Sequence, residues 1–126
     1  MINIALERDD EAILSFSEVI RKDILHSSAY YNLGVLLRRK GRPEESIKSY
    51  KKAINLKPDY VQAHNNLGTL LKDKGKYKEA INCFKEAVKL KPDHYIAYYN
   101  MGLTYRNLDR NDEAINSLNQ SLSIKP

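Results

Sequence analysis

The side chains that most often do chemistry form no recognisable catalytic set in this sequence. The three histidines, His26, His64 and His94, lie too far apart in sequence to form the i,i+4 pair of a helical zinc site. The sequence contains no glycine-rich phosphate loop and no HExxH or GxSxG string. The single cysteine, Cys83, has no second thiol for a disulfide or a Cys-based zinc site. These observations predict a protein that is not an enzyme and that uses no metal or cofactor.

The carboxylate clusters are better explained by structure than by catalysis. We expect Asp9–Asp10–Glu11 and Glu44–Glu45 to lie at helix starts, where negative charge complements the helix dipole. His64 stands in an apolar series of helical period, so we expect it to pack in the core.

Two other residue types recur at a constant spacing that suits binding. An amide offers both a donor and an acceptor, which an extended peptide backbone needs, and a cation favours acidic side chains. Duplication copies any residue, however, so repetition also fits inheritance without a role, and helix-end cations also complement the dipole. The asparagines are Asn32, Asn66 and Asn100, and the cations are Arg38, Lys72 and Arg106.

The same spacing of 34 residues runs through the chain and identifies it as a tandem array. Residues 27–60 and 61–94 are identical at 16 of 34 positions. A third copy covers 95–126, and residues 1–26 form a partial copy in which EAILSF matches EAINCF of residues 79–84. The recurring markers are Gly34, Gly68 and Gly102, together with Pro58, Pro92 and Pro126.

Each copy has the pattern of two helices separated by a tight turn. Gly41 and Gly75 suit the left-handed conformation that ends a helix, and Pro43 suits the first position of the next helix. Asp109 replaces the glycine in the third copy, which predicts a strained or slightly shifted turn there. We expect helices near residues 10–22, 28–40, 44–56, 62–74, 78–90, 96–108 and 112–124.

The repeated residues resemble the tetratricopeptide pattern of aromatic, Leu-Gly, large apolar, small, aromatic, small and proline. In the first full copy these residues are Tyr30, Leu33, Gly34, Leu37, Ser46, Tyr50, Ala53 and Pro58. The other copies follow the pattern with departures such as His64 and Leu118 for the two aromatic residues. The resemblance implies an all-α fold: an α-solenoid of stacked antiparallel helix pairs forming a right-handed superhelix, with residues 1–126 as a single domain.

The resemblance also explains a glycine inside a helix. Gly34, facing small residues such as Ser46, would let the paired helices approach closely, which offsets the loss of helix propensity of about 1 kcal/mol. Among the tyrosines, we expect Tyr30, Tyr50 and Tyr98 in the core, whereas Tyr31 and Tyr99 are displaced toward the groove. The first helix of each copy would line that concave groove.

Helical phase selects the residues that face the groove. They are Ser28, Tyr31, Asn32, Val35, Arg38 and Arg39, then Gln62, Asn65, Asn66, Thr69, Lys72 and Asp73, then Ile96, Tyr99, Asn100, Leu103, Arg106 and Asn107. We expect the peptide-binding residues to be Tyr31, Asn32, Arg38, Asn65, Asn66, Lys72, Tyr99, Asn100 and Arg106.

The resemblance implies a protein–protein interaction module whose groove binds an extended segment of a protein or peptide partner, with acidic side chains of the partner meeting the cations. The asparagine series is similar to that lining the superhelical arm of protein O-GlcNAc transferases, which implies capture of a peptide backbone. The clamp of heat-shock co-chaperones is not matched, because only Asn66 of its positions is kept. The alternatives are a repeat arm of a larger enzyme or regulator, a nucleic-acid-binding protein and a self-assembling scaffold.

Charge and apolar patterning bear on partners and location. The formal net charge of +5 is spread along the chain, which favours a solvated surface over a nucleic-acid site. No apolar run is long enough to span a membrane and no signal peptide is visible, so we expect a cytoplasmic protein without membrane contact. We expect homo-oligomer contacts through incompletely covered end residues, which are Phe16 and Val19 at one end and Leu118 and Leu122 at the other.

Overall fold

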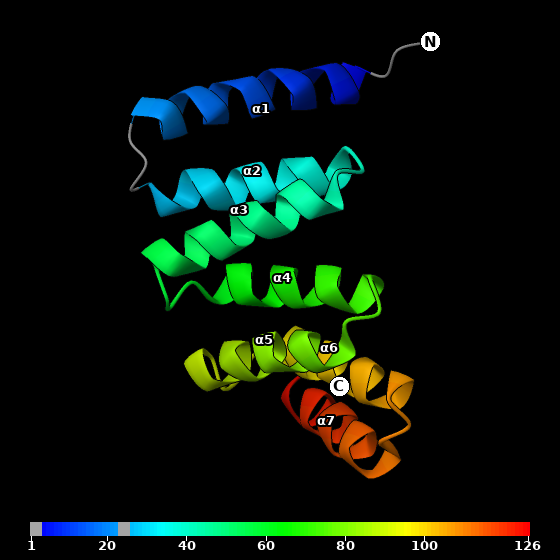
Figure 1. Cartoon of the computed structure of the whole chain (residues 1–126). Helices are drawn as coiled ribbons and strands as arrows, with labels where there is room; N and C mark the ends of the chain where they lie inside the picture. The colour runs from blue at the N-terminus through cyan, green and yellow to red at the C-terminus, as the bar shows by residue number, and fades with distance from the viewer. Residues whose placement is uncertain (1–3, 23–25) are drawn as a thin grey trace. The chain divides into compact units, whose positions relative to one another are not determined.

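The residues that the structure describes fold into seven α-helices (Figure 1). The computed structural model describes residues 4–22 and 26–126, and within the first helix it describes the side chains of residues 8–18. No strand occurs in these ranges, so the expected all-α fold is confirmed. The helices are α1 (Ile4–Lys22), α2 (Ser27–Arg39), α3 (Pro43–Leu56), α4 (Val61–Asp73), α5 (Tyr77–Leu90), α6 (Tyr95–Asn107) and α7 (Asn111–Ile124).

The helices group into two compact units, Met1–Ala63 and His64–Pro126. In the first unit α2 packs against α3, and α1 packs against α2. In the second unit α6 packs against α7, and α5 packs against α6. Each unit therefore buries its apolar residues between consecutive helices of the repeat.

Six of the seven helices begin and end within one residue of the expected positions. Pro43 occupies the start of α3, and Gly41 and Gly75 adopt the left-handed conformation with φ of 73° and 78°. Asp109 takes the same conformation with φ of 57°, and its N–H donates to the Arg106 carbonyl at 3.0 Å, as that of Gly41 donates to Arg38. The third turn is therefore strained but not shifted, because aspartate can enter this region at an energetic cost.

The first helix is longer than the repeat predicts. It begins at Ile4, so Asp9, Asp10 and Glu11 lie inside α1 and not at its start, and that expectation is wrong. The physical reason is Glu7, a good helix former, which stands one repeat before Gly41. With no turn residue at that position, the helix continues through it.

The recurring glycines lie where paired helices approach closely, but their partners are large side chains. A Cβ atom on Gly34 would lie 2.8 Å from Cδ1 of Tyr50, so Gly34 faces the tyrosine ring and not a small residue. Ser46 contributes differently, because its hydroxyl donates to the Gly34 carbonyl oxygen at 2.5 Å. The close approach is as expected, and the missing side chain makes room for an aromatic ring.

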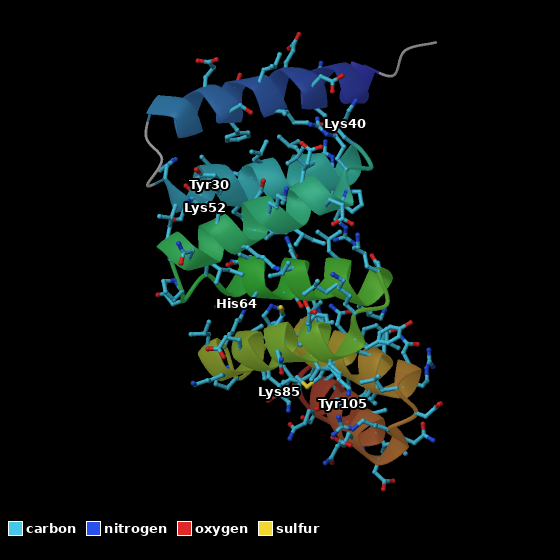
Figure 2. The ribbon with its side chains drawn as sticks, in the orientation of Figure 1. Tyr30, Lys40, Lys52, His64, Lys85 and Tyr105 are labelled. Atoms are coloured by element: carbon cyan, nitrogen blue, oxygen red, sulfur yellow. The ribbon has the colours of Figure 1, made fainter. Side chains whose placement is uncertain are left out.

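The core contains some of the predicted tyrosines and not others. Tyr50 is 1% exposed, as expected. His64, which Figure 2 labels on α4, is buried, also as expected. Tyr30 and Tyr98 are only half-buried, so the expectation of full burial is wrong for both. Each is the fourth residue of its helix, and a side chain near a helix end has fewer neighbours to cover it.

Candidate functional site

In the second unit, α4 and α6 bring two side-chain amides together. The Nδ2 atom of Asn100 donates to Oδ1 of Asn65 at 3.4 Å. Each asparagine is also bonded through its backbone carbonyl, which accepts the hydroxyl of the threonine four residues later: Thr69 to Asn65 at 3.0 Å and Thr104 to Asn100 at 2.7 Å. The threonine bonds lie within each helix, so the contact between the two amides is the bond that joins α4 to α6 here.

An exposed stripe of apolar and basic residues continues along α6. Ile96 is 45% exposed and Tyr99 is 50% exposed, and they are one helical turn apart. Leu103 is half-buried and Arg106 is exposed further along the same face. On α4, Asn66 and Lys72 are half-buried. We call the set of Asn65, Asn66, Lys72, Tyr99, Asn100 and Arg106 the α4–α6 surface.

The equivalent aromatic residue in the first unit has different surroundings. Tyr31 is half-buried and stacks on Tyr60 with ring centroids 4.9 Å apart, while its ring is tilted against Tyr50 at 5.8 Å. Burial raises the pKa of the Tyr60 hydroxyl, and Lys57 places its Nζ atom 5.0 Å from the centre of the same ring. Tyr31 is therefore part of an aromatic cluster, whereas Tyr99 is open to solvent.

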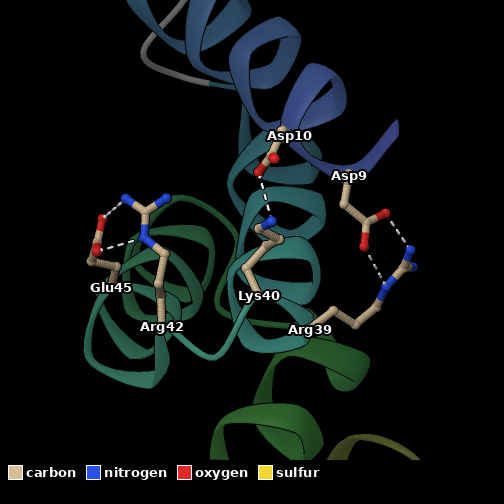
Figure 3. A network of polar contacts seen from close by, with 6 residues as sticks. All are labelled: Asp9, Asp10, Arg39, Lys40, Arg42 and Glu45. Carbon is tan, nitrogen blue, oxygen red and sulfur yellow. Dashed lines mark hydrogen bonds and ion pairs between the residues drawn. The ribbon is translucent and has the colours of Figure 1, made fainter. Parts of the chain in front are cut away.

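Arg39, which helical phase predicts to face the groove, is held by an acidic residue of α1 (Figure 3). Both oxygens of Asp9 accept from Arg39, with Nε to Oδ2 at 3.1 Å, and Asp9 is only 6% exposed. Lys40 pairs with Asp10 at 2.9 Å. Sequence reasoning missed this network because it placed the carboxylates at a helix start; the excess of acid at 9–11 opposite Arg39 and Lys40 was the available signal.

A third ion pair joins two residues at the start of α3. Arg42 and Glu45 are joined by Nε to Oε1 at 2.8 Å and by a terminal guanidinium nitrogen to Oε2 at 2.6 Å (Figure 3). The hydrogen bond between them raises the pKa of Arg42 and lowers the pKa of Glu45. Arg110 and Glu113 repeat this pairing at the start of α7. Glu44 and Glu45 lie in the first turn of α3, as expected.

A cavity of about 290 Å³ lies between α1 and α2 in the first unit. Its lining residues are Ala12, Phe16, Asn32, Val35, Leu36 and Arg39. Phe16 is half-buried, while Val19 lies outside the described side chains. In the second unit, Leu118 is half-buried and Leu122 is 57% exposed.

The nine expected binding residues all lie on first helices of the repeats. The structure brings Asn65 and Asn100 into contact in the second unit. Asn32 and Arg38 are exposed on α2 in the first unit. The full assignment is Tyr31, Asn32 and Arg38 on α2, Asn65, Asn66 and Lys72 on α4, and Tyr99, Asn100 and Arg106 on α6.

In the part of the chain that the structure describes, no cluster of three or more His, Cys, Asp or Glu side chains could hold a metal ion. Across those same residues, each helix is too short or too polar to cross a membrane.

Comparison with known proteins identifies a protein family and several solved structures that resemble this chain. The family model described as "Tetratricopeptide repeat" matches residues 27–93 and 59–126. A crystal structure of MamA matches with a TM-score of 0.90 at 26% identity, over 93% of this chain and 68% of that chain. MamA 41-end from Desulfovibrio magneticus RS-1 matches with a TM-score of 0.88 at 23% identity, over 94% of this chain and 67% of that one.

A further similar structure is that of YrrB, described as "a TPR protein with an unusual peptide-binding site". It matches with a TM-score of 0.87 at 25% identity, over 98% of this chain and 63% of that chain. The chain thus spans about two thirds of the length of these structures. No curated protein matches its sequence.

Proposed function

Because the chain belongs to the tetratricopeptide repeat family, we propose that it is a non-catalytic interaction module that binds an extended segment of a partner protein. The binding residues are those of the α4–α6 surface, with Tyr31, Asn32 and Arg38 of α2 as their counterparts in the first unit. In repeat proteins of this kind, stacked helices create extended binding surfaces.

The observation that carries the proposal is the pair of amides on neighbouring helices. The contact between Asn100 and Asn65 uses one N–H of one amide and one oxygen lone pair of the other. Each amide has further donor and acceptor capacity, which an extended peptide backbone can meet at its own N–H and C=O groups. At 3.4 Å the contact is long, so it can yield to a ligand at small cost.

The α4–α6 surface and the adjoining Ile96 carry groups that select side chains of the partner. Ile96 and Tyr99 expose apolar area within one turn of Asn100, which favours an apolar side chain of the partner there. Lys72 and Arg106 lie toward the ends of α4 and α6 and favour acidic side chains. The combination indicates a partner segment that carries both apolar and acidic residues.

A solved structure lends support to a peptide ligand. YrrB is described as having a peptide-binding site, and this chain resembles it at 25% identity over 98% of its length. We propose only that this chain also binds a peptide, and not that it binds the same peptide as YrrB.

The test is a screen of acidic and amidated peptides by array, followed by calorimetric titration of the tightest binder. Asn65→Ala and Asn100→Ala each remove hydrogen bonds worth about 0.5–1.5 kcal/mol, so we expect each to weaken every peptide by about 2- to 12-fold. Asn82→Ala is the matched control, because Asn82 is exposed on α5, outside the α4–α6 surface. Wild-type affinity in both α4–α6 variants would contradict the proposal.

A further inference from the structure

The cavity between α1 and α2 has a partly covered aromatic residue in its wall. Phe16 and Ala12 of α1 supply one wall, and both are half-buried. Val35 and Leu36 supply the apolar part of the opposite wall, while Asn32 and Arg39 supply its polar part. A hollow of this size between two helices, with apolar walls and polar groups at its edge, suits the apolar face of an amphipathic helix.

The repeat shows what covers this wall elsewhere in the chain. Phe16 in EAILSF corresponds to Phe84 in EAINCF, and Ala12 corresponds to Ala80. Phe84 and Ala80 are both 0% exposed. Gly68 of α4 lies on the Phe84 ring so closely that a Cβ atom there would be 2.7 Å from Cε1. A helix with a glycine at its crossing point is thus the natural cover for this pair of residues.

The α2 wall of the cavity also indicates that a helix is its natural cover. Asn32 of α2 corresponds to Asn100 of α6, and Asn100 is bonded to Asn65, which lies on that same covering helix α4. In the second unit one helix therefore meets both the aromatic residue of α5 and the asparagine of α6. In the first unit, the equivalent pair, Phe16 and Asn32, lines the cavity.

We infer that this cavity is a docking site for an amphipathic helix of a partner protein. The helix presents asparagine, leucine, glycine and leucine in the spacing N-x-L-G-x-x-L, as Asn65, Leu67, Gly68 and Leu71 do in α4. Its glycine crosses Phe16 and its asparagine bonds to Asn32. This site lies in the first unit, apart from the α4–α6 surface, and it takes a helix and not an extended segment; it shares Asn32 with the residues proposed to bind that segment.

The occupant is a partner and not a second copy of this chain. The helix of this chain that carries the pattern, α4, already uses it internally, since Gly68 is buried against Phe84, and the equivalent glycines of α2 and α6, Gly34 and Gly102, are buried against Tyr50 and Leu118. To reach the cavity of another copy, such a helix would have to leave its own unit and expose an aromatic or leucine side chain. A partner helix carries no such cost.

The experiment uses the full chain labelled with 4-fluorophenylalanine and a synthetic helix as the probe. The chain has two phenylalanines, so its ¹⁹F spectrum has two resonances, which Phe16→Leu assigns. The probe is the 13-residue α4 sequence, VQAHNNLGTLLKD. We expect the probe to shift the Phe16 resonance in a saturable manner and to leave the Phe84 resonance unchanged.

Matched variants test whether the glycine of the probe helix lies against Phe16. The probe with Gly68→Leu should bind about tenfold more weakly or worse, because a larger side chain cannot cross the ring. In the protein, Ala12→Arg should abolish the shift, while Ser15→Arg, at an exposed position of α1, should not. An unshifted Phe16 resonance overturns the proposal, as does equal affinity for the two probes.

Two further outcomes also overturn it. A shift of the Phe84 resonance would mean that the probe replaces α4 in its own unit. A Phe16 resonance that moves with protein concentration in the absence of probe would mean that a second copy fills the cavity, and sedimentation would then show self-association.

Discussion

Gly68 and Phe84 define a tight crossing between α4 and α5: a Cβ atom on Gly68 would lie 2.7 Å from the Cε1 atom of Phe84, which is 0% exposed. The backbone conformation of Gly68 is helical, so any residue could adopt it. The glycine is therefore required by packing. The same relation between Gly34 and Tyr50 indicates that it is a general requirement of the repeat.

Gly68→Ala should destabilise the protein although alanine is the better helix former. The added methyl group must displace a fully buried ring, which costs about 1–3 kcal/mol and outweighs a propensity gain of about 1 kcal/mol. Gly68→Leu should cost more. Urea unfolding measures the effect, and Lys85→Ala, at an exposed position of α5, is the control expected within about 0.5 kcal/mol of wild type. Equal midpoints for Gly68→Leu and the control would contradict the packing argument.

Asp109→Gly should stabilise the protein. Asp109 holds φ of 57°, where a side chain costs about 1–2 kcal/mol and glycine costs nothing, although glycine also gains entropy in the unfolded chain. The strain of about 1–2 kcal/mol exceeds the entropy cost of about 0.4–1 kcal/mol, so we expect a net gain of up to about 1 kcal/mol. The reverse change, Gly75→Ala at φ of 78°, should lose a similar amount, since no atom lies within 4 Å of the new Cβ and only strain acts. Thermal unfolding of both variants gives the comparison, and shifts of the same sign would refute it.

Arg39→Met should loosen α1 from α2. It leaves the nearly buried carboxylate of Asp9 without its bidentate partner, at a cost of about 1–3 kcal/mol. Lys40→Met removes the more exposed pair with Asp10 and should cost about 0–1 kcal/mol. Hydrogen exchange should quicken in α1 for Arg39→Met while α7 keeps its protection. Unchanged exchange in α1 would show that apolar contacts alone hold the helix.

The start of α6 should weaken as the solution becomes acidic. His94 caps this helix, with its Nδ1 accepting from the Ala97 N–H at 3.2 Å, and only the unprotonated nitrogen can accept. Burial, with a smaller effect of Lys91, lowers the pKa of His94 below its ordinary value of about 6.5. The capping contribution is therefore complete above about pH 6.5 and is lost as the pH falls toward the lowered folded-state value.

His94→Asn provides the comparison, because asparagine caps a helix without titrating in this range. Unfolding free energies, measured at a pH of about 7.5 and at a pH about two units lower, should fall more for the wild type than for His94→Asn. His26 and His64 are present in both proteins and cancel in the difference. An equal fall in both would rule out the cap as the pH-sensitive group.

The sequence predicted the helix boundaries because Gly41, Gly75 and Pro43 act locally: a backbone conformation or a missing N–H ends or starts a helix whatever surrounds it. The exception, α1, has the same explanation, since Glu7 replaces the turn residue. Local rules were thus sufficient where the signal was local.

The surroundings of individual site residues were less predictable. Tyr31 and Tyr99 occupy the same repeat position, yet one stacks on Tyr60 and the other is 50% exposed. Likewise, helical phase placed Arg39 toward the groove, but the carboxylate of Asp9 holds it. Helical periodicity predicts the helix face on which a side chain lies. The residues that contact that side chain belong to other helices, so they depend on the tertiary packing.

Charge reversal of Lys72 and Arg106 should remove the preference of the α4–α6 surface for acidic peptides. Both cations lie in the last turn of their helices, so Lys72→Glu and Arg106→Glu turn local attraction into repulsion without touching the amide pair. For an acidic peptide we expect these variants to bind more weakly than the wild type. The wild-type affinity should decrease from low to high salt, because salt screens the charged part of the interaction, and this decrease should disappear in the variants. For the same peptide with its carboxylates amidated, affinity should change little. Titration of both peptides at two salt concentrations measures this, with Lys89→Glu on α5 as the control of equal charge change. If the control lowers the affinity of the acidic peptide as much as the two α4–α6 variants do, the net charge of the protein and not these two positions sets the preference.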